Sequence, residues 1–100
     1  MMTVITRIRV KEGAEPEWDA AMGQRLEAAK GRPGWVGGQL LMPLEAFNER
    51  LIVGTWETIA DWEAWHEDEA FRATRERLDQ LQEEPGTMTW HEVLLDERSQ

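Results

Sequence analysis

The chain contains no cysteine, no tyrosine and a single serine among its 100 residues. Without cysteine it forms no disulfide, no thiolate metal site and no cysteine nucleophile. The one serine is Ser99, next to the C-terminal residue, where a chain end frays. A Ser-His-Asp hydrolase needs a serine held rigidly beside its base, so this class of enzyme is not expected.

Positive charge is also scarce, with 11 lysines and arginines against 20 aspartates and glutamates and a net charge of −9. Because like charges repel, such a chain is not expected to bind the phosphate backbone of nucleic acids or anionic membranes. No apolar run reaches the length that crosses a bilayer, and the first residues lack the pattern of a signal peptide. We therefore expect a soluble, cytoplasmic protein with no nucleic-acid or membrane partner.

The remaining pattern is that of one small folded domain with an ordinary apolar content of 41%. Alternating β-branched and polar residues predict strands over 3–10, 35–42, 50–56 and 87–95. Helical spacing predicts one helix between Glu15 and Gly31 and another between Thr58 and Pro85, with Asp68 capping a second piece of the latter. The order β-α-β-β-α-β is that of the ferredoxin-like α+β fold, in which two helices cover one face of an antiparallel sheet.

The two faces of the predicted sheet are both apolar. A face left open by the helices should be polar if it meets water. In regular alternation, however, the strand over 35–42 places Leu40 and Met42 on one face and Trp35 and Leu41 on the other. An open face of this kind is an association surface, and we expect a second copy of the chain to cover it as a homodimer.

Five short segments make the chain resemble a known family. They are RIRVKEG at 7–13, RPGWVG at 32–37, TWE at 55–57, WEAW at 62–65 and EAFR at 69–72. In this order they resemble the antibiotic biosynthesis monooxygenase (ABM) domains of the dimeric α/β-barrel superfamily. The resemblance implies an ABM-like domain over residues 1–96, a polar tail over 97–100, and a pocket between the sheet and the helices of each protomer.

The resemblance also implies a function. Members include oxygenases that attack quinol-type substrates without metal or flavin, so we expect a cofactor-independent monooxygenase that uses O2 on a small aromatic molecule. Haem binding or haem degradation is one alternative, and a non-catalytic, small-molecule-binding stress-response dimer is another. Where haem-degrading members carry an Asn and a Trp, this chain has Thr6 and Trp65. Arg75 stands at the position of their haem-ligating His, and a guanidinium has no lone pair for iron.

Three residues of the second helical stretch are the candidates for catalysis. Trp65 is expected to stack on a flat substrate, although aromatic residues at helical spacing also typify a packed core. Arg75 follows about three turns later, where it would stabilise a phenolate or superoxide-like anion. Its alternative is a surface ion pair with Asp79 or Glu76. His66 is the candidate general base, because imidazole titrates near neutral pH.

Three further residues are predicted to bind the substrate: Thr6, Phe71 and Trp62. Thr6 would donate or accept one hydrogen bond from a central strand, and Phe71 would hold the aromatic ring together with Trp65. Each of the three is also compatible with plain packing, Thr6 as a β-branched filler and Trp62 as a core residue.

Metal binding is not expected. Glu63 and His66 have the Glu-x-x-His spacing of di-iron sites, but those sites need the motif twice. The other histidine, His91, follows Trp90 on a predicted strand and offers no second copy. It is a second candidate for the base or an ordinary strand residue.

Overall fold

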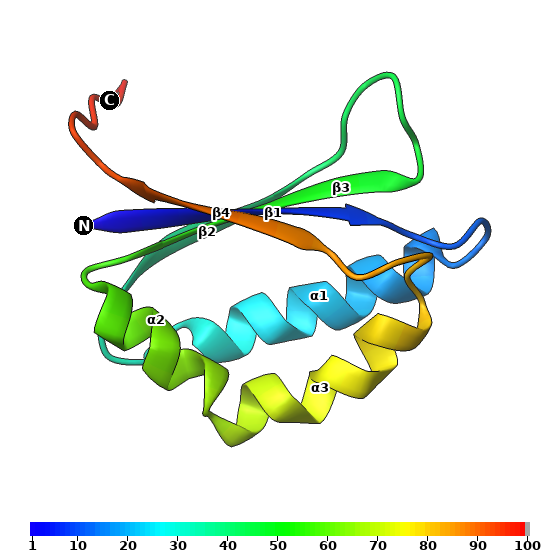
Figure 1. Ribbon diagram of the computed structural model, residues 1–100, viewed down its shortest axis with the longest axis horizontal. Coiled ribbons are helices and arrows are strands. Elements are labelled where there is room, and N and C mark those ends of the chain that lie inside the picture. The colour runs from blue at the N-terminus through cyan, green and yellow to red at the C-terminus, as the bar shows by residue number, and fades with distance from the viewer. Residues whose placement is uncertain (100) are drawn as a thin grey trace.

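The computed structural model describes residues 1–99 and has the predicted element order (Figure 1). The elements are β1 (Met2–Arg9), α1 (Glu15–Ala29), β2 (Trp35–Leu41), β3 (Glu49–Trp56), α2 (Ile59–His66), α3 (Glu69–Gln80) and β4 (Thr87–Glu92). The strands form one antiparallel sheet in the order β2-β3-β1-β4. All the helices lie on one face of this sheet (Figure 1), which confirms the ferredoxin-like α+β fold.

The helices begin at the residues that local chemistry favours. Pro16 lies in the first turn of α1, where no intrahelical donor is lost. The Thr58 hydroxyl oxygen accepts from the Asp61 backbone N–H at 3.1 Å, and the Asp68 carboxylate accepts from the Ala70 N–H at 2.8 Å. These two caps start α2 and α3 separately, so the helical stretch after Thr58 is divided where the sequence predicted. Within residues 1–99, no helix combines the length and the apolar character that a membrane crossing requires.

A β-bulge near the start of β2 changes which side chains face the helices. Between Trp35 and Gly37 the register with β3 shifts by one residue, which leaves Val36 as the inserted residue. Trp35 therefore shares the helix-covered face with Leu40, and the prediction that they lie on opposite faces was wrong. Side chains alternate between the two faces of a strand only where no residue is inserted, so the alternation predicted from the sequence does not hold across the bulge. The Trp35 ring lies over Gly38, where an added Cβ would be 2.7 Å from the indole.

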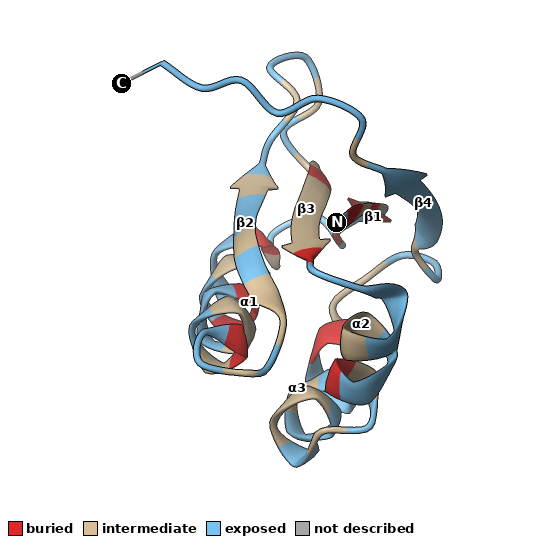
Figure 2. Cartoon of the chain, turned by 90° about the vertical axis from the view of Figure 1, so that its left-hand side faces the viewer, coloured by how far each residue is buried: buried red, intermediate tan, exposed pale blue. Residues whose placement is uncertain are grey.

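The core divides into two clusters between the sheet and the helices, and buried residues are found in β1, β3, α1 and α2 (Figure 2). In the first, Trp18, Leu78 and Val10 are almost completely buried, and the Trp18 indole donates to the Gln82 side-chain oxygen at 3.0 Å. The second is built around tryptophans of β3 and α2, Trp56 and Trp65 among them. Each fully buried side chain of this size stabilises the fold by roughly 1.5–3 kcal/mol.

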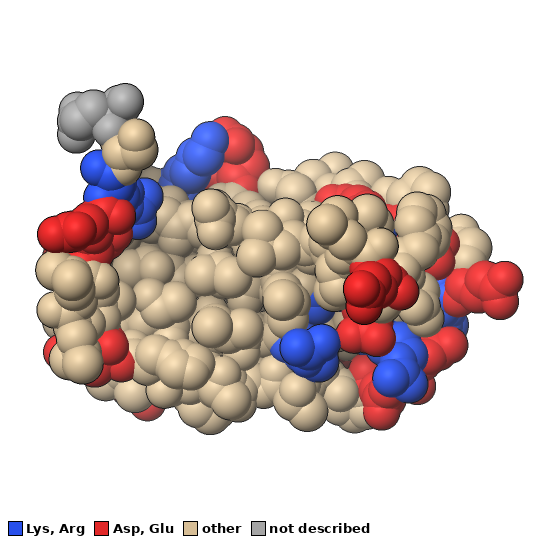
Figure 3. Space-filling view, turned by 90° about the horizontal axis from the view of Figure 1, so that it is seen from above, with Lys and Arg blue, Asp and Glu red and all other residues tan. Residues whose placement is uncertain are grey.

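The open face of the sheet is poor in charge along its middle (Figure 3). Ile5 of β1 and Leu51 and Val53 of β3 point away from the helices there and are partly exposed. Thr3 and Thr55 share a 2.8 Å hydrogen bond between their hydroxyls. Acidic and basic side chains gather at the two ends of this face instead (Figure 3).

Strand β4 ends earlier than predicted, at Glu92 rather than at residue 95. Its pairing with β1 stops at Met2, and one further hydrogen bond joins the Val93 N–H to the Met1 carbonyl at 2.9 Å. Without another backbone partner the ladder stops, although the side chains remain apolar. Leu94 and Leu95 are consequently 92% and 78% exposed. Of the predicted polar tail over 97–100, Gln100 lies outside the described residues.

Candidate functional site

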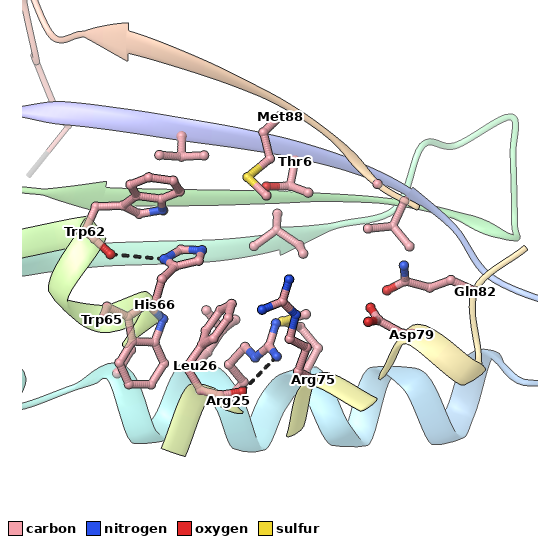
Figure 4. Close-up of a pocket in the computed structure, with 18 of the residues that line it drawn as sticks. Thr6, Arg25, Leu26, Trp62, Trp65, His66, Arg75, Asp79, Gln82 and Met88 are labelled. Carbon is pink, nitrogen blue, oxygen red and sulfur yellow. Dashed lines mark hydrogen bonds between the residues drawn. The ribbon is translucent and has the colours of Figure 1, made fainter. Parts of the chain in front are cut away.

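A cavity of about 590 Å3 lies between the sheet and the three helices (Figure 4). Its volume is within the range of sites that bind small molecules. Residues of all the strands line it from one side, and the helices line it from the other. The cavity brings together all the side chains predicted for the site: Thr6, Trp62, Trp65, His66, Phe71 and Arg75.

Seven aromatic rings form a continuous row, and six of them, all but Trp90, line the cavity. Successive ring centroids are 5.1 Å apart for Trp35–Trp56, 6.2 Å for Trp56–Trp65, 5.7 Å for Trp65–Phe71, 4.2 Å for Phe71–His66, 4.2 Å for His66–Trp62 and 5.7 Å for Trp62–Trp90. Trp65 is only 6% exposed, so it is both a core residue and part of the cavity wall. Trp62 is less buried than Trp65 and also lines the cavity.

His66 is the histidine that lines the cavity. Its Nδ1 lies 3.0 Å from the Trp62 carbonyl oxygen, and because a carbonyl only accepts, Nδ1 carries the proton and donates it. The lone pair of the neutral ring is then on Nε2. The ring lies inward from Trp62, toward the cavity (Figure 4). Burial, with a smaller effect from Arg25 and Arg75, lowers the pKa of His66. At neutral pH its Nε2 is therefore free to accept a proton.

Arg25 of α1 also lines the cavity and was not predicted from the sequence. Its Nε donates to the Thr74 hydroxyl at 2.8 Å, and one terminal nitrogen donates to the Phe71 carbonyl at 3.1 Å. Its guanidinium carbon is 3.9 Å from the centre of the Phe71 ring. Burial lowers the pKa of Arg25 to about 10, so it stays charged at neutral pH. The one available signal was its position, three residues after the buried Met22 on the apolar stripe of α1.

Arg75 of α3 points its guanidinium into the same cavity, above that of Arg25 (Figure 4). Among residues 1–99 it forms no ion pair, so the alternative of a surface pair with Asp79 or Glu76 was wrong. Asp79 does line the cavity, but no carboxylate oxygen comes within 4.0 Å of either guanidinium. Arg75 and Asp79 of α3 thus line the cavity and are also exposed to solvent.

Of the remaining candidate residues, Thr6 lines the cavity and His91 does not. Thr6 points from β1 toward the helices and lies beside Met88 of β4 (Figure 4). His91 is exposed and pairs in register with Thr3, which puts it on the open face and outside the cavity. Within residues 1–99, no three His, Cys, Asp or Glu side chains are grouped so that they could hold a metal ion.

The same fold, with a sheet covered on one face by helices, is found in solved structures of antibiotic biosynthesis monooxygenases. The model of that family, described as "Antibiotic biosynthesis monooxygenase", matches residues 1–77. The chain belongs to this family.

Characterised proteins of two kinds are similar to the chain. A mycobilin-producing haem oxygenase of Mycobacterium tuberculosis is 33% identical over 69 residues, which are 69% of this chain and 66% of that enzyme. The chain thus spans about two thirds of this relative's length. The structure of a haem degrader from the same organism, with two haems in its active site, has a TM-score of 0.78 at 28% identity and covers 98% of this chain and 100% of that one.

A cofactor-independent oxygenase from Streptomyces nogalater has the same fold. Its structure has a TM-score of 0.85 at 17% identity, and the match covers 95% of this chain and 94% of that one. At this identity the likeness concerns the fold alone.

Proposed function

We propose that this chain is a monooxygenase that inserts oxygen from O2 into a flat, electron-rich phenol or quinol, without a metal or an organic cofactor. One observation carries the proposal: a neutral imidazole presents its lone pair to an aromatic-walled cavity beside two guanidinium groups. These are the groups that the reaction needs, since the substrate must lose a proton before it can reduce O2.

The steps follow from the positions of the side chains. The substrate ring packs against Trp65 and Phe71, and its hydroxyl gives a proton to Nε2 of His66. The positive charge of Arg75, at the exposed side of the cavity, stabilises the resulting anion. The anion transfers one electron to O2, and the substrate radical and superoxide combine into a peroxide. The imidazolium of His66 returns its proton to the peroxide. Elimination of water from this hydroperoxide, with loss of the hydrogen on the same ring carbon, leaves a new carbonyl group there.

The test is oxygen consumption by the purified protein over a panel of anthrones and naphthohydroquinones. Uptake above the rate of autoxidation, and one 18O atom in the product from 18O2, are expected. A panel that gives no protein-dependent uptake would count against the proposed reaction. Heat-denatured protein supplies the baseline, because it contains the same side chains without the cavity.

Haem is the second candidate ligand, and two observations favour it. The unprotonated Nε2 of His66 has the lone pair that a haem iron requires, and the curated relative is itself a haem oxygenase. Thr6 and Arg75, by contrast, offer no such ligand. A titration with ferric haem tests this candidate. A Soret shift that His66→Ala abolishes would support haem binding through His66, and an unchanged Soret band on addition of the protein would refute haem binding.

We further propose that the chain works as a homodimer joined through the open face of the sheet. Support comes from the partly exposed Ile5, Leu51 and Val53 in a region poor in charge, because such patches are association surfaces. Sedimentation velocity should give the mass of two chains for the wild type and of one chain for Leu51→Asp. Ala73→Asp, on the exposed side of α3, is the control and should leave the dimer intact. A wild-type protein that sediments as one chain at micromolar concentration would refute this.

A further inference from the structure

Two arginines differ from all the others among residues 1–99. The chain has nine arginines, and seven of them form ion pairs with carboxylates. The two without such a pair are Arg25 and Arg75, and both line the cavity. In a chain with 20 acidic side chains and 11 basic ones, acids are not in short supply. Arg25 is partly buried and Arg75 is exposed at the cavity, so a ligand can take up both positive charges without breaking an ion pair.

The geometry leaves hydrogen-bond donors available on both groups. A guanidinium carries five N–H donors. Arg25 uses one on the Thr74 hydroxyl and one on the Phe71 carbonyl, and these bonds hold the group in place while the rest of its donors face the cavity. Arg75 makes no hydrogen bond to any residue of 1–99. The two groups lie one above the other at the centre of the cavity (Figure 4).

The electrostatics of this arrangement favour an anion. Arg25 is partly buried and Arg75 is exposed, and the low pKa of Arg25 reflects its own burial together with the nearby charge of Arg75. Asp79 compensates from beyond 4.0 Å. Glu83 and Glu84, also on the cavity wall, are engaged by Arg9. No acidic group of the described chain therefore occupies the position between the two guanidiniums.

We infer that the ligand of this cavity is a planar aromatic molecule that carries a carboxylate, and that Arg25 and Arg75 bind this carboxylate together. This inference rests on the proposed function only in taking the cavity as the ligand site. With the carboxylate at the arginines, the ring lies along Phe71 and Trp65 and a hydroxyl group reaches His66. Two sources have this chemistry: a small hydroxyaromatic acid and the propionate of a porphyrin.

Anaerobic calorimetric titration of the intact protein tests the inference without turnover. The probes are 6-hydroxy-2-naphthoate, whose hydroxyl and carboxylate lie at opposite ends of the ring system, and its neutral analogue 6-hydroxy-2-naphthamide. Charge-assisted hydrogen bonds at this site should make the carboxylate bind at least about tenfold more tightly than the amide. Arg25→Gln and Arg75→Gln should each lower the affinity for the carboxylate by about tenfold and change that for the amide little. Arg77→Gln removes the same charge from the exposed side of α3, where it pairs with Glu17, and should preserve the preference.

A second pair of probes separates the two sources. Ferric haem that binds at least tenfold better than its dimethyl ester, with the arginine variants abolishing the difference, would assign the carboxylate to a porphyrin. Arg25→Lys, which keeps the charge, should retain part of the preference, and thermal melting identifies any variant that fails to fold. Equal affinity for acid and amide, equal loss of both in the variants, or no binding of either acid at millimolar concentration would overturn the inference. Oxygen uptake plays no part in these readouts, so the inference and the proposed reaction can fail separately.

Discussion

Replacing His66 by glutamine is the sharpest perturbation of the proposed reaction. The hydrogen bond from Nδ1 to the Trp62 carbonyl fixes the lone pair of the ring on Nε2, and glutamine offers no basic nitrogen in that place. Loss of a general base lowers kcat/KM by about 10²- to 10⁴-fold, or roughly 2.7–5.4 kcal/mol of transition-state stabilisation. His91→Gln makes the same exchange on the open face and should leave kcat/KM unchanged.

The structure also gives the cost of this substitution in stability. The His66 ring lies 4.2 Å from each of its neighbours Trp62 and Phe71. Two aromatic contacts contribute about 1–3 kcal/mol together. A domain of this size has about 5–15 kcal/mol of stability, so His66→Gln should remain folded and its loss of activity can be attributed to chemistry. A urea denaturation curve measured beside the oxygen-uptake assay checks this.

The pH profile tests the same assignment without a mutation. Because burial lowers the pKa of His66, the folded state binds its proton less readily than the unfolded chain does. The base should stay active as the pH falls to the ordinary histidine value, and kcat/KM should decline only below about 6.5. The contribution of the neutral ring to stability is full above that value and is lost as the pH falls from it toward the lowered pKa. An acid limb above 6.5, or a His66→Gln variant with more than half of the wild-type kcat/KM, would refute the reasoning.

Two further predictions concern the scaffold. Gly34→Ala should destabilise the protein by about 2–4 kcal/mol in urea denaturation, because Gly34 has a φ of +83° and its added Cβ would collide with the Asp61 side chain. Asp19→Ala should cost about 2 kcal/mol of unfolding free energy, since it leaves the buried Arg50 guanidinium without its two carboxylate bonds at 2.8 and 3.0 Å. The value is reduced from that of a fully buried pair because the Asp19 side chain is 40% exposed.

Matched substitutions isolate each cause. Gly31→Ala has the same backbone strain, with a φ of +81° and nothing within 4 Å of the added Cβ, so it should cost only about 1 kcal/mol. Glu27→Ala removes the exposed pair with Lys30 on the same helix as Asp19 and should change stability by less than about 1 kcal/mol. Equal effects in either pair of variants would contradict the explanation given for it.

The parts of the fold that depend on local chemistry were predictable. The caps at Thr58 and Asp68 each act on an N–H two or three residues away, so sequence spacing was enough to place α2 and α3. Trp35 was assigned to the wrong face because an inserted residue is invisible to a period of two. Strand β4 was predicted too long because apolar side chains say nothing about where a backbone partner ends.

Most of the cavity-lining residues considered for the site were also predictable from the sequence, but Arg25 was not. Trp62, Trp65 and His66 lie on α2, Phe71 and Arg75 lie on α3, and all five line the cavity. Their roles in binding and catalysis remain predictions. Arg25 was missed because its position depends on Phe71 and Thr74, which are 46 and 49 residues away in the sequence. A long-range contact of this kind appears only when α1 and α3 are packed side by side.

The row of rings along the cavity wall has a consequence for spectroscopy. Five of the six indoles belong to the row, and Trp18 alone lies in the other core cluster. Excitation absorbed by one indole can pass to its neighbours at these separations, so the emission of the five is shared rather than residue-specific. A molecule that quenches any one of them should dim the group, and the light that remains should come chiefly from Trp18.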